Sequence, residues 1–263
     1  MQGLVLDDKG SPLRKGDKVS SLNDEGLRSH LQRLRLGTPG IVVPVMVTTS
    51  DYWIIDKPQG FVGHPISLFD TNTITHWAFA EDPELATFFS EIQPTLTPHR
   101  LDTGTSGLLI VARHPTVFQQ WRERFQGKEI EKQYLAWCWG KPKSNIFEIN
   151  FSIAHHKAND GVMAIPALGE PYRSPVMPAQ TIVKVERVLS DKFLARVICY
   201  SGVTHQVRIH LASVGFPLVG DVVYDKEFCR RENRPEWHCL RAVRLQWKQT
   251  NYEVPTSDFL AQF

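Results

Sequence analysis

The alternation of hydrophobic and polar residues along the chain predicts more strands than helices. Apolar runs at residues 52–55 and 108–112 predict two buried strands. Residues 114–126 carry apolar side chains at helical spacing and predict an amphipathic helix. Residues 130–139 alternate as a strand, so Lys132 and Tyr134 are expected on the same face.

Two further strands are expected at residues 181–189 and 193–200, joined by a short polar turn. These elements do not follow the regular strand–helix–strand order that a doubly wound sheet requires. We therefore expect an α+β fold whose central sheet is mixed and mainly antiparallel, flanked by helices and loops.

A helix is predicted after the last of these strands, with Thr204 as its N-cap and Gly215 as its C-cap. Its expected buried face consists of Val207, Leu211 and Val214. Arg208 is expected beside this face, one turn after His205.

The first 44 residues differ in pattern from the remainder. They contain turn signals before residue 22, a helical pattern at 25–36 and a Gly- and Pro-containing stretch at 37–44. We therefore divide the chain into an N-terminal extension, residues 1–44, and a main domain, residues 45–263.

Composition limits the class of protein without identifying it. The chain has 263 residues, is 42% hydrophobic and 22% charged, and carries a net charge of +2, which is weak evidence for a nucleic-acid partner. No apolar run could span a bilayer and no secretory signal is visible, so we expect no membrane partner.

Four cysteines are too few for a disulfide framework, which favours a cytoplasmic location. Cys229, His238 and Cys239 lack the paired spacing of a zinc site, and no metal is expected.

One loop concentrates polar residues just before a predicted strand. Its polar members are His99, Arg100, Asp102, Thr103, Thr105 and Ser106. A loop on a rigid strand commonly presents functional groups, although an ordinary turn would use the same residue types. The string at residues 102–106 also spells the aspartic-protease loop, but that chemistry needs a second such aspartate and the chain contains no second copy. Ser106 is not in a nucleophile elbow, because G-x-S-x-G is absent.

Four ordered segments resemble the RluA family of pseudouridine synthases. The string HRLDTGTSGLL at residues 99–109 resembles the family signature, and DKPQG…HP at 56–65 resembles its upstream motif. KQY at 132–134 resembles its K-x-Y strand, and SGVTHQVRIHLA at 201–212 resembles its T-G-R-T-H-Q-I-R-V-H-L-A segment. Gly-Asp…Tyr at 220–224 continues the last match. The resemblance implies the pseudouridine synthase fold and isomerisation of uridine in RNA.

The resemblance also implies the catalytic residues. Asp102 is the expected catalytic carboxylate and Arg208 the arginine that keeps it ionised. Tyr134 is expected to stack on the target base. Whether Asp102 bonds to the sugar or takes a sugar proton stays open. The reaction requires no cofactor, because it transfers no electrons and uses no group donor.

The matched motifs supply the residues expected to bind RNA. They are Lys57, His99, Arg100, Thr105, Lys132, His205 and Gln206. Arg100 resembles the residue that enters the RNA when the target nucleotide leaves the stack. Lys132 is expected to shield the pocket or bind phosphate, with a solvated lysine as the alternative. The expected partner is structured ribosomal or transfer RNA, and the default oligomeric state is a monomer.

Two residues depart from the family pattern. Val203 replaces the family arginine and Asp56 replaces its asparagine, so altered RNA affinity or substrate choice is expected. Val203 and the modest net charge of +2 motivate the second hypothesis, an RNA-binding protein that keeps the fold without catalysis. Residues 1–20 also resemble the end of an S4 RNA-binding module, too short to be complete.

Overall fold

The computed structural model describes residues 40, 42–64, 73–85, 95–232 and 234–263. The S4-like segment and the predicted helix at 25–36 lie outside the described residues. The division of the chain at residue 44 stays a prediction for the same reason.

The chain forms two compact units. Unit 1 consists of residues 1–101 and 109–122, and unit 2 of residues 102–108 and 123–263. The described elements of unit 1 are β1 (Val45–Thr48), β2 (Tyr52–Lys57), α2 (Ile74–Glu81), the end of β3 (Ser106–Ala112) and most of α4 (Pro115–Gln126). Unit 2 holds the start of β3, the end of α4, β4 (Glu131–Trp139), β5 (Ile146–Ile149), β6 (Ile153–His156), β7 (Met163–Ala164), η2 (Pro166–Leu168), β8 (Tyr172–Met177), β9 (Thr181–Val188), β10 (Lys192–Cys199), α5 (Gln206–Ser213), η3 (Phe228–Arg230), β11 (Leu240–Trp247), β12 (Thr250–Glu253) and α6 (Ser257–Leu260).

Unit 1 is held together by aromatic side chains against a short sheet, β1–β2–β3. Trp53 on β2 meets Trp77 on α2 edge to face, with ring centroids 5.4 Å apart. Tyr52 meets Trp121 on α4 in the same way at 5.5 Å. Such pairs add specific geometry to the burial of large apolar surfaces. Helix α2 begins at Thr73, whose hydroxyl accepts the backbone N–H of His76.

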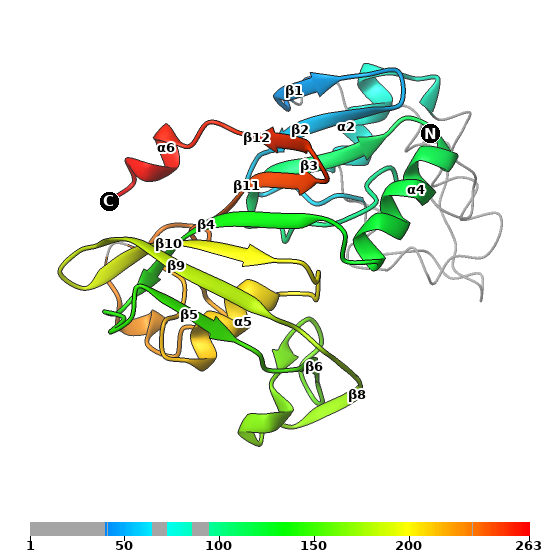
Figure 1. Ribbon diagram of the computed structural model, residues 1–263. Coiled ribbons are helices and arrows are strands. Elements are labelled where there is room, and N and C mark those ends of the chain that lie inside the picture. Colours follow the sequence, from blue (N-terminus) through cyan, green and yellow to red (C-terminus); the bar gives the residue numbers. More distant parts are fainter. Residues whose placement is uncertain (1–39, 41, 65–72, 86–94, 233) are drawn as a thin grey trace, which may run out of the picture. The chain divides into compact units, whose positions relative to one another are not determined.

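Unit 2 contains a sheet in the order β3–β11–β4–β10–β9–β5, with β12 on the far end of β11 (Figure 1). Here β3 pairs with β11 in parallel, whereas the other pairings are antiparallel. A smaller sheet, β7–β6–β8, follows β5 in the chain. The expectation of an α+β fold with a mixed, mainly antiparallel sheet is confirmed.

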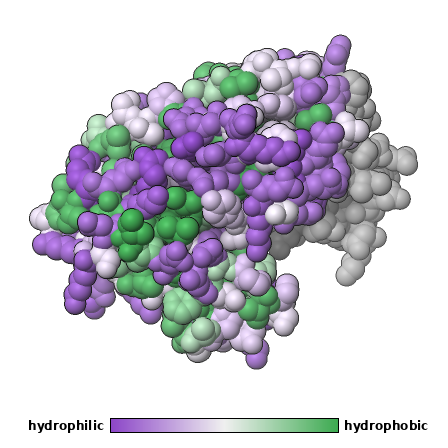
Figure 2. Space-filling view, viewed as in Figure 1, coloured by the Kyte–Doolittle hydropathy of each residue, from purple (hydrophilic) through white to green (hydrophobic). Residues whose placement is uncertain are grey.

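The core of unit 2 lies between α5 and the sheet. Val207 and Leu211 of α5 pack with Val183, Phe193 and Val197 of β9 and β10. Strand β10 buries residues on both faces, as a central strand should, whereas β9 exposes most of its second half. Figure 2 shows polar residues over much of the visible face and an apolar patch over β5 and β9, where Ile146 is 61% exposed.

The crossing of β3 and β11 requires a glycine. Gly107 has φ +110°, and a Cβ atom there would lie 2.0 Å from the carbonyl oxygen of Ala242. No side chain fits such a contact, so Gly107 allows β3 to approach β11 just after the polar loop.

Three details of the predicted helix at 204–215 are wrong. Its C-cap is Val214 rather than Gly215. The N-cap is His205 rather than Thr204, and it adopts a left-handed conformation with φ 56°. Gln206 instead stabilises the preceding loop, because its Oε1 accepts the backbone N–H of Val203. Val214 is 37% exposed rather than buried, since it follows the last helical residue.

Candidate active site

Asp102 lies in a tight turn that precedes β3. Its carbonyl oxygen accepts the backbone N–H of Thr105 at 3.0 Å. The hydroxyl of Thr105 is 2.9 Å from Nε2 of His238, which lies just before β11. Gly104 faces the same histidine, and a Cβ atom there would lie 2.8 Å from its Cε1. The turn that carries Asp102 is therefore packed against residues 237–238.

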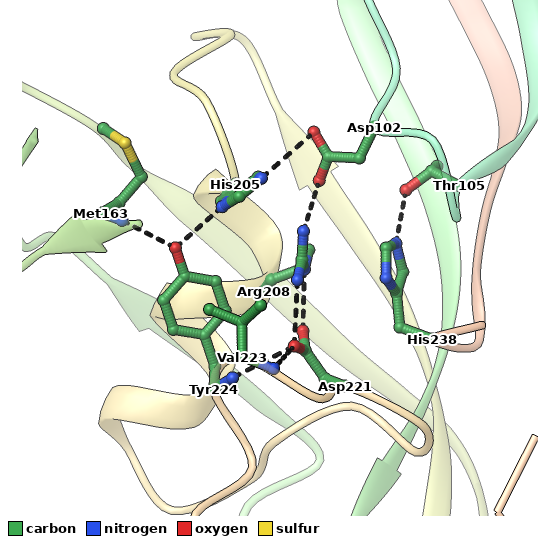
Figure 3. A network of polar contacts seen from close by, with 9 residues as sticks. All are labelled: Asp102, Thr105, Met163, His205, Arg208, Asp221, Val223, Tyr224 and His238. Carbon is green, nitrogen blue, oxygen red and sulfur yellow. Dashed lines mark hydrogen bonds and ion pairs between the residues drawn. The ribbon is translucent and has the colours of Figure 1, made fainter. Parts of the chain in front are cut away.

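Arg208 brings two carboxylates of unit 2 together (Figure 3). Its Nη1 donates to Oδ2 of Asp102 at 3.2 Å. Its Nε and Nη2 donate to the two oxygens of Asp221, at 2.8 and 3.0 Å. The Arg208 side chain is 6% exposed, that of Asp102 16% and that of Asp221 0%. The expected pairing of Arg208 with a residue 106 positions away is present in the structure.

Arg208 and Asp221 each stabilise the charged form of the other. Burial opposes the charge of Arg208, but the hydrogen bonds and charges of Asp221 and Asp102 outweigh it and raise the pKa of Arg208. Burial also opposes ionisation of Asp221, yet Arg208 lowers the pKa of Asp221 below its ordinary value. Two carboxylates and one guanidinium leave one net negative charge, and Asp102 is the more exposed carboxylate.

A second chain of polar contacts reaches the other oxygen of Asp102. The hydroxyl of Tyr224 accepts the backbone N–H of Met163 at 2.9 Å and lies 2.8 Å from Nδ1 of His205. Burial, the first cause, raises the pKa of Tyr224, so the phenol is neutral and can donate its proton to Nδ1. Nε2 then carries the imidazole proton, and it lies 3.9 Å from Oδ1 of Asp102.

Tyr134 faces the same region from β4. Burial raises the pKa of Tyr134 well above its ordinary range, and the charges of Cys199 and Asp102 add to this effect. The Asp102 contribution is electrostatic and requires no contact between the two side chains. Tyr134 packs partly buried against the core of unit 2 and is opposite Val197 of β10. A neutral aromatic ring is thus fixed on strand β4.

Lys132 and Gln206 stabilise the loop that leads into α5. Nζ of Lys132 donates to the carbonyl oxygens of Tyr200 and Ser201 at 3.2 and 2.6 Å. Burial lowers the pKa of Lys132 to about 8. Gln206 accepts the hydroxyl proton of Ser201 and donates to the carbonyl oxygen of Gln180. The RNA-binding roles of Lys132 and Gln206 stay predictions, and the contacts described here hold the loop.

The three remaining predicted residues lie in unit 1. Lys57 is fully buried, and its Nζ donates to the carbonyl oxygens of Pro58 and Phe61. Nε2 of His99 accepts the backbone N–H of Ile110 at 3.0 Å. Arg100 is exposed. Their roles in RNA binding stay predictions.

Within unit 2, the structure brings Asp102, Arg208, His205 and Thr105 into one network. The charge of Asp102 also contributes to the raised pKa of Tyr134. Three side chains of the network were not predicted as site residues: Asp221, Tyr224 and His238. The first two belong to the matched segment at 220–224, which was a usable signal. No local signal marks His238, which lies 133 residues from its partner Thr105. Among the described residues, no group of three His, Cys, Asp or Glu side chains could hold a metal ion, and no helix there is long and apolar enough to cross a membrane.

Comparisons with known proteins give a consistent result. The pattern of the family described as RNA pseudouridylate synthase matches residues 51–213. An uncharacterized RNA pseudouridine synthase of Chlorobaculum parvum is 31% identical over 233 residues, covering 85% of this chain and 68% of the relative. The ribosomal large subunit pseudouridine synthase D of Nitrosomonas europaea is 32% identical over 177 residues, covering 66% of this chain and 47% of the relative. This chain thus spans from about half to about two thirds of the length of these relatives.

A solved structure has a similar fold. It is human RNA pseudouridylate synthase domain containing 1, with a TM-score of 0.65 and 22% identity. The similarity covers 82% of this chain and 84% of the human chain.

Proposed function

This chain belongs to the RNA pseudouridylate synthase family, and on that premise we propose that it isomerises uridine to pseudouridine in structured RNA, with Asp102 as its catalytic carboxylate. Membership confirms the resemblance to RluA-type enzymes and makes the chain an RNA pseudouridine synthase, an isomerase, by family. The observation that carries the proposal is the 3.2 Å contact between Asp102 and Arg208, which come from distant parts of the sequence.

The reaction breaks the N1–C1′ bond, turns the base and rejoins it through C5, so that C5 loses its proton and N1 gains one. Asp102 either bonds to the sugar or takes a sugar proton, and both roles require an ionised carboxylate. A partly buried carboxylate tends to gain a proton unless a cation favours its charged form. Arg208 supplies that cation and remains charged at any physiological pH.

The target base has to leave the RNA stack to reach Asp102. Tyr134 offers an aromatic face for it, and base stacking contributes about 1–3 kcal/mol. Extrusion of a nucleotide costs a few kcal/mol, and we assign Arg100 to the space that the nucleotide leaves. The phenol of Tyr134 is neutral at physiological pH. To take the proton from C5, its hydroxyl would therefore have to pass its own proton to an acceptor.

We assign ribosomal or transfer RNA as the substrate. The names of several relatives refer to the large ribosomal subunit, which favours ribosomal RNA over transfer RNA. We further propose a cytoplasmic monomer that uses no cofactor. Lys132, Lys57, His99, Thr105, His205 and Gln206 are assigned to the binding of RNA or its target nucleotide, directly or by holding the loops around it.

The test is a pseudouridine map of total RNA from cells with and without the gene, followed by assay of the mapped RNA with the purified chain. Loss of a modified position in the deletion strain identifies the substrate. Asp102→Asn keeps the shape of the side chain but removes its charge, so it should abolish product formation and leave RNA binding nearly unchanged.

Asp191→Asn is the matched control, because Asp191 lies in the exposed turn between β9 and β10. It should retain full activity. An active Asp102→Asn variant would refute the proposed mechanism. An unchanged RNA map would instead favour the RNA-binding protein without catalysis that the Val203 replacement suggested.

A further inference from the structure

The side-chain contacts of Asp102 are too few to fix its carboxylate. Among the described residues it receives one hydrogen bond, from Nη1 of Arg208 at 3.2 Å, and Nε2 of His205 lies 3.9 Å from its other oxygen. A single hydrogen bond does not set the plane of a carboxylate, whereas two parallel bonds would. The position of Asp102 therefore depends on the turn at residues 102–105 that carries it.

His238 contacts this turn at two successive residues. Nε2 of its imidazole lies 2.9 Å from the hydroxyl of Thr105, the last residue of the turn (Figure 3). A Cβ atom at Gly104 would lie 2.8 Å from Cε1 and 3.0 Å from Nδ1 of the same ring. The imidazole thus occupies the space that a side chain at residue 104 would need, and His238 is only 6% exposed. One buried ring restrains the turn by a polar contact and by packing.

The backbone next to His238 is hydrogen-bonded on both sides. Cys239 donates its N–H to the carbonyl oxygen of Val219 at 2.8 Å. The carbonyl oxygen of Cys239 accepts the backbone N–H of Trp137, on β4, at 3.1 Å. The imidazole is therefore attached to a rigid part of the sheet, which a group that positions another group requires.

The His238 ring is neutral, so its hydrogen bond to Thr105 can run in either direction. Burial, and after it the charge of Arg208, lowers the pKa of His238 to about 4. A neutral imidazole carries its proton on one nitrogen, so Nε2 either donates to the hydroxyl of Thr105 or accepts its proton. A glutamine amide can take the place of Nε2 in either role, whereas an asparagine amide is one methylene too short. This difference in reach makes the contact testable.

We infer that His238 is a positioning residue for the reaction, because it holds the turn at residues 102–105 so that the Asp102 carboxylate stays directed at Arg208. The inference rests on the proposed function. His238 acts through Thr105 and Gly104, and it is assigned no contact with the substrate.

The test is a single-turnover assay on the mapped RNA with the full chain in excess. The saturating rate constant of this assay reports the chemical step, while the amplitude reports the fraction of folded, active enzyme. His238→Asn removes the contact with Thr105. We expect its rate constant to fall roughly 10- to 100-fold, the effect of a small misplacement of a reacting group. The chain concentration that gives half the maximal rate, which reports RNA affinity, should stay within about twofold of the wild type.

His238→Gln is the conservative variant, because its amide reaches the position of Nε2. Its rate constant should lie within about threefold of that of the wild type. Loss of the ring alone would slow the asparagine and glutamine variants alike, since neither amide replaces an imidazole. Rescue by glutamine therefore separates the contact with Thr105 from a general loss of packing.

His76→Gln is the matched control. His76 is 7% exposed, and its Nδ1 lies 2.7 Å from the hydroxyl of Thr73. It has the burial and the hydroxyl partner of His238, but it belongs to α2 of unit 1. This contact uses Nδ1, so here the longer amide is the one that loses it. The amplitude can fall in this variant, but the rate constant should equal that of the wild type.

A double-mutant cycle tests whether His238 acts through Thr105. Thr105→Val removes the hydroxyl with little change in side-chain volume, and it should itself lower the rate constant. Adding His238→Asn to Thr105→Val should then slow the reaction by less than about threefold further. Thr105→Val also serves alone if His238→Asn does not fold, and a wild-type rate constant in it would then overturn the inference.

Four other results would overturn the inference: a wild-type rate constant in His238→Asn, a loss confined to the amplitude, a His238→Gln variant as slow as His238→Asn, or additive effects in the cycle. An inactive wild-type chain would overturn the proposed function and this inference with it. An active wild type with an equally active His238→Asn variant overturns the inference alone.

Discussion

Two cations of unit 2, Arg208 and Lys132, are each 5% exposed but are held by different groups. Arg208 meets two carboxylates, and its pKa is raised despite burial. Lys132 meets two backbone carbonyl groups, and burial lowers its pKa to about 8. Full opposite charges thus offset the cost of burying a cation, and carbonyl dipoles offset only part of it. We conclude that the first environment preserves the charge of the guanidinium group, and that the second uses an ammonium group to fix a loop.

The largest loss of stability is expected in a variant that leaves a buried charge without its partner. Arg208→Met leaves Asp221 buried and unpaired, which should lower the free energy of unfolding by about 3–5 kcal/mol at neutral pH. Arg208 lowers the pKa of Asp221 in the wild type, so that stabilisation is present above the ordinary pKa of an aspartate and is lost as the pH falls. In the variant, burial without Arg208 raises the pKa of Asp221. The cost of burying the unpaired carboxylate therefore also disappears at low pH, where the group is protonated. The difference between the two proteins, measured by urea denaturation, should be largest at neutral pH and shrink on acidification.

Arg196→Met is the control for this measurement. Arg196 pairs with Glu186 at 2.6 Å, but both side chains are about one-third exposed. Its loss should cost less than about 1 kcal/mol. Equal losses of unfolding free energy in the two variants would show that burial between two carboxylates does not make the Arg208 interactions more stabilising than an exposed ion pair.

A smaller effect is expected at Lys132, where stability also rises with pH but in an alkaline window rather than an acidic one. Its folded pKa of about 8 lies below the ordinary value of 10.5, so between these values the unfolded chain binds a proton that the folded chain does not. Stability therefore rises with pH across this window. Relative to Lys132→Met, the wild type should gain about 3 kcal/mol between pH 7 and pH 10.5. Urea denaturation of both proteins at several pH values measures this, and a constant difference would contradict the assignment of a costly buried charge.

The smallest effect is expected at Gly202, beside the same lysine. A Cβ atom there would lie 3.3 Å from Nζ of Lys132, the mobile end of a flexible side chain. Gly202→Ala should therefore cost less than about 1 kcal/mol, because the ammonium group can shift slightly. It should also remove space for water near Nζ and lower the pKa of Lys132 further, so that the gain in stability begins at a lower pH. A loss of several kcal/mol would show instead that the loop at 201–203 cannot move.

The sequence predicted the strands and helices whose periodicity is strong. β2, β3, β4, β9, β10 and α4 are confirmed within a few residues. The α+β class and the pseudouridine synthase fold are confirmed as well. The central strand β11 was not predicted, and Arg241 and Arg244 interrupt its apolar pattern. Both arginines are only half-buried, at positions where their guanidinium groups can still reach solvent or polar partners.

Only those residues of the candidate site that lie in a matched sequence segment could be predicted. Asp102, Tyr134 and Arg208 came from matched segments, and Asp221 and Tyr224 lay in one whose roles had not been assigned. His238 pairs with Thr105 only because β3 and β11 are neighbours in the sheet, a tertiary fact that no local pattern contains. Burial lowers the pKa of His238 to about 4, with the charge of Arg208 as the second cause, so this imidazole is neutral where Thr105 contacts it.

The crossing at Gly107 has a consequence for tolerance to mutation. Asp102 is five residues before this glycine, and the 2.0 Å that a Cβ atom would leave to the Ala242 carbonyl oxygen makes even alanine too large. A methyl group at this point would separate the two strands and displace Asp102 from Arg208. The contact between these two side chains thus depends on there being no side chain at residue 107.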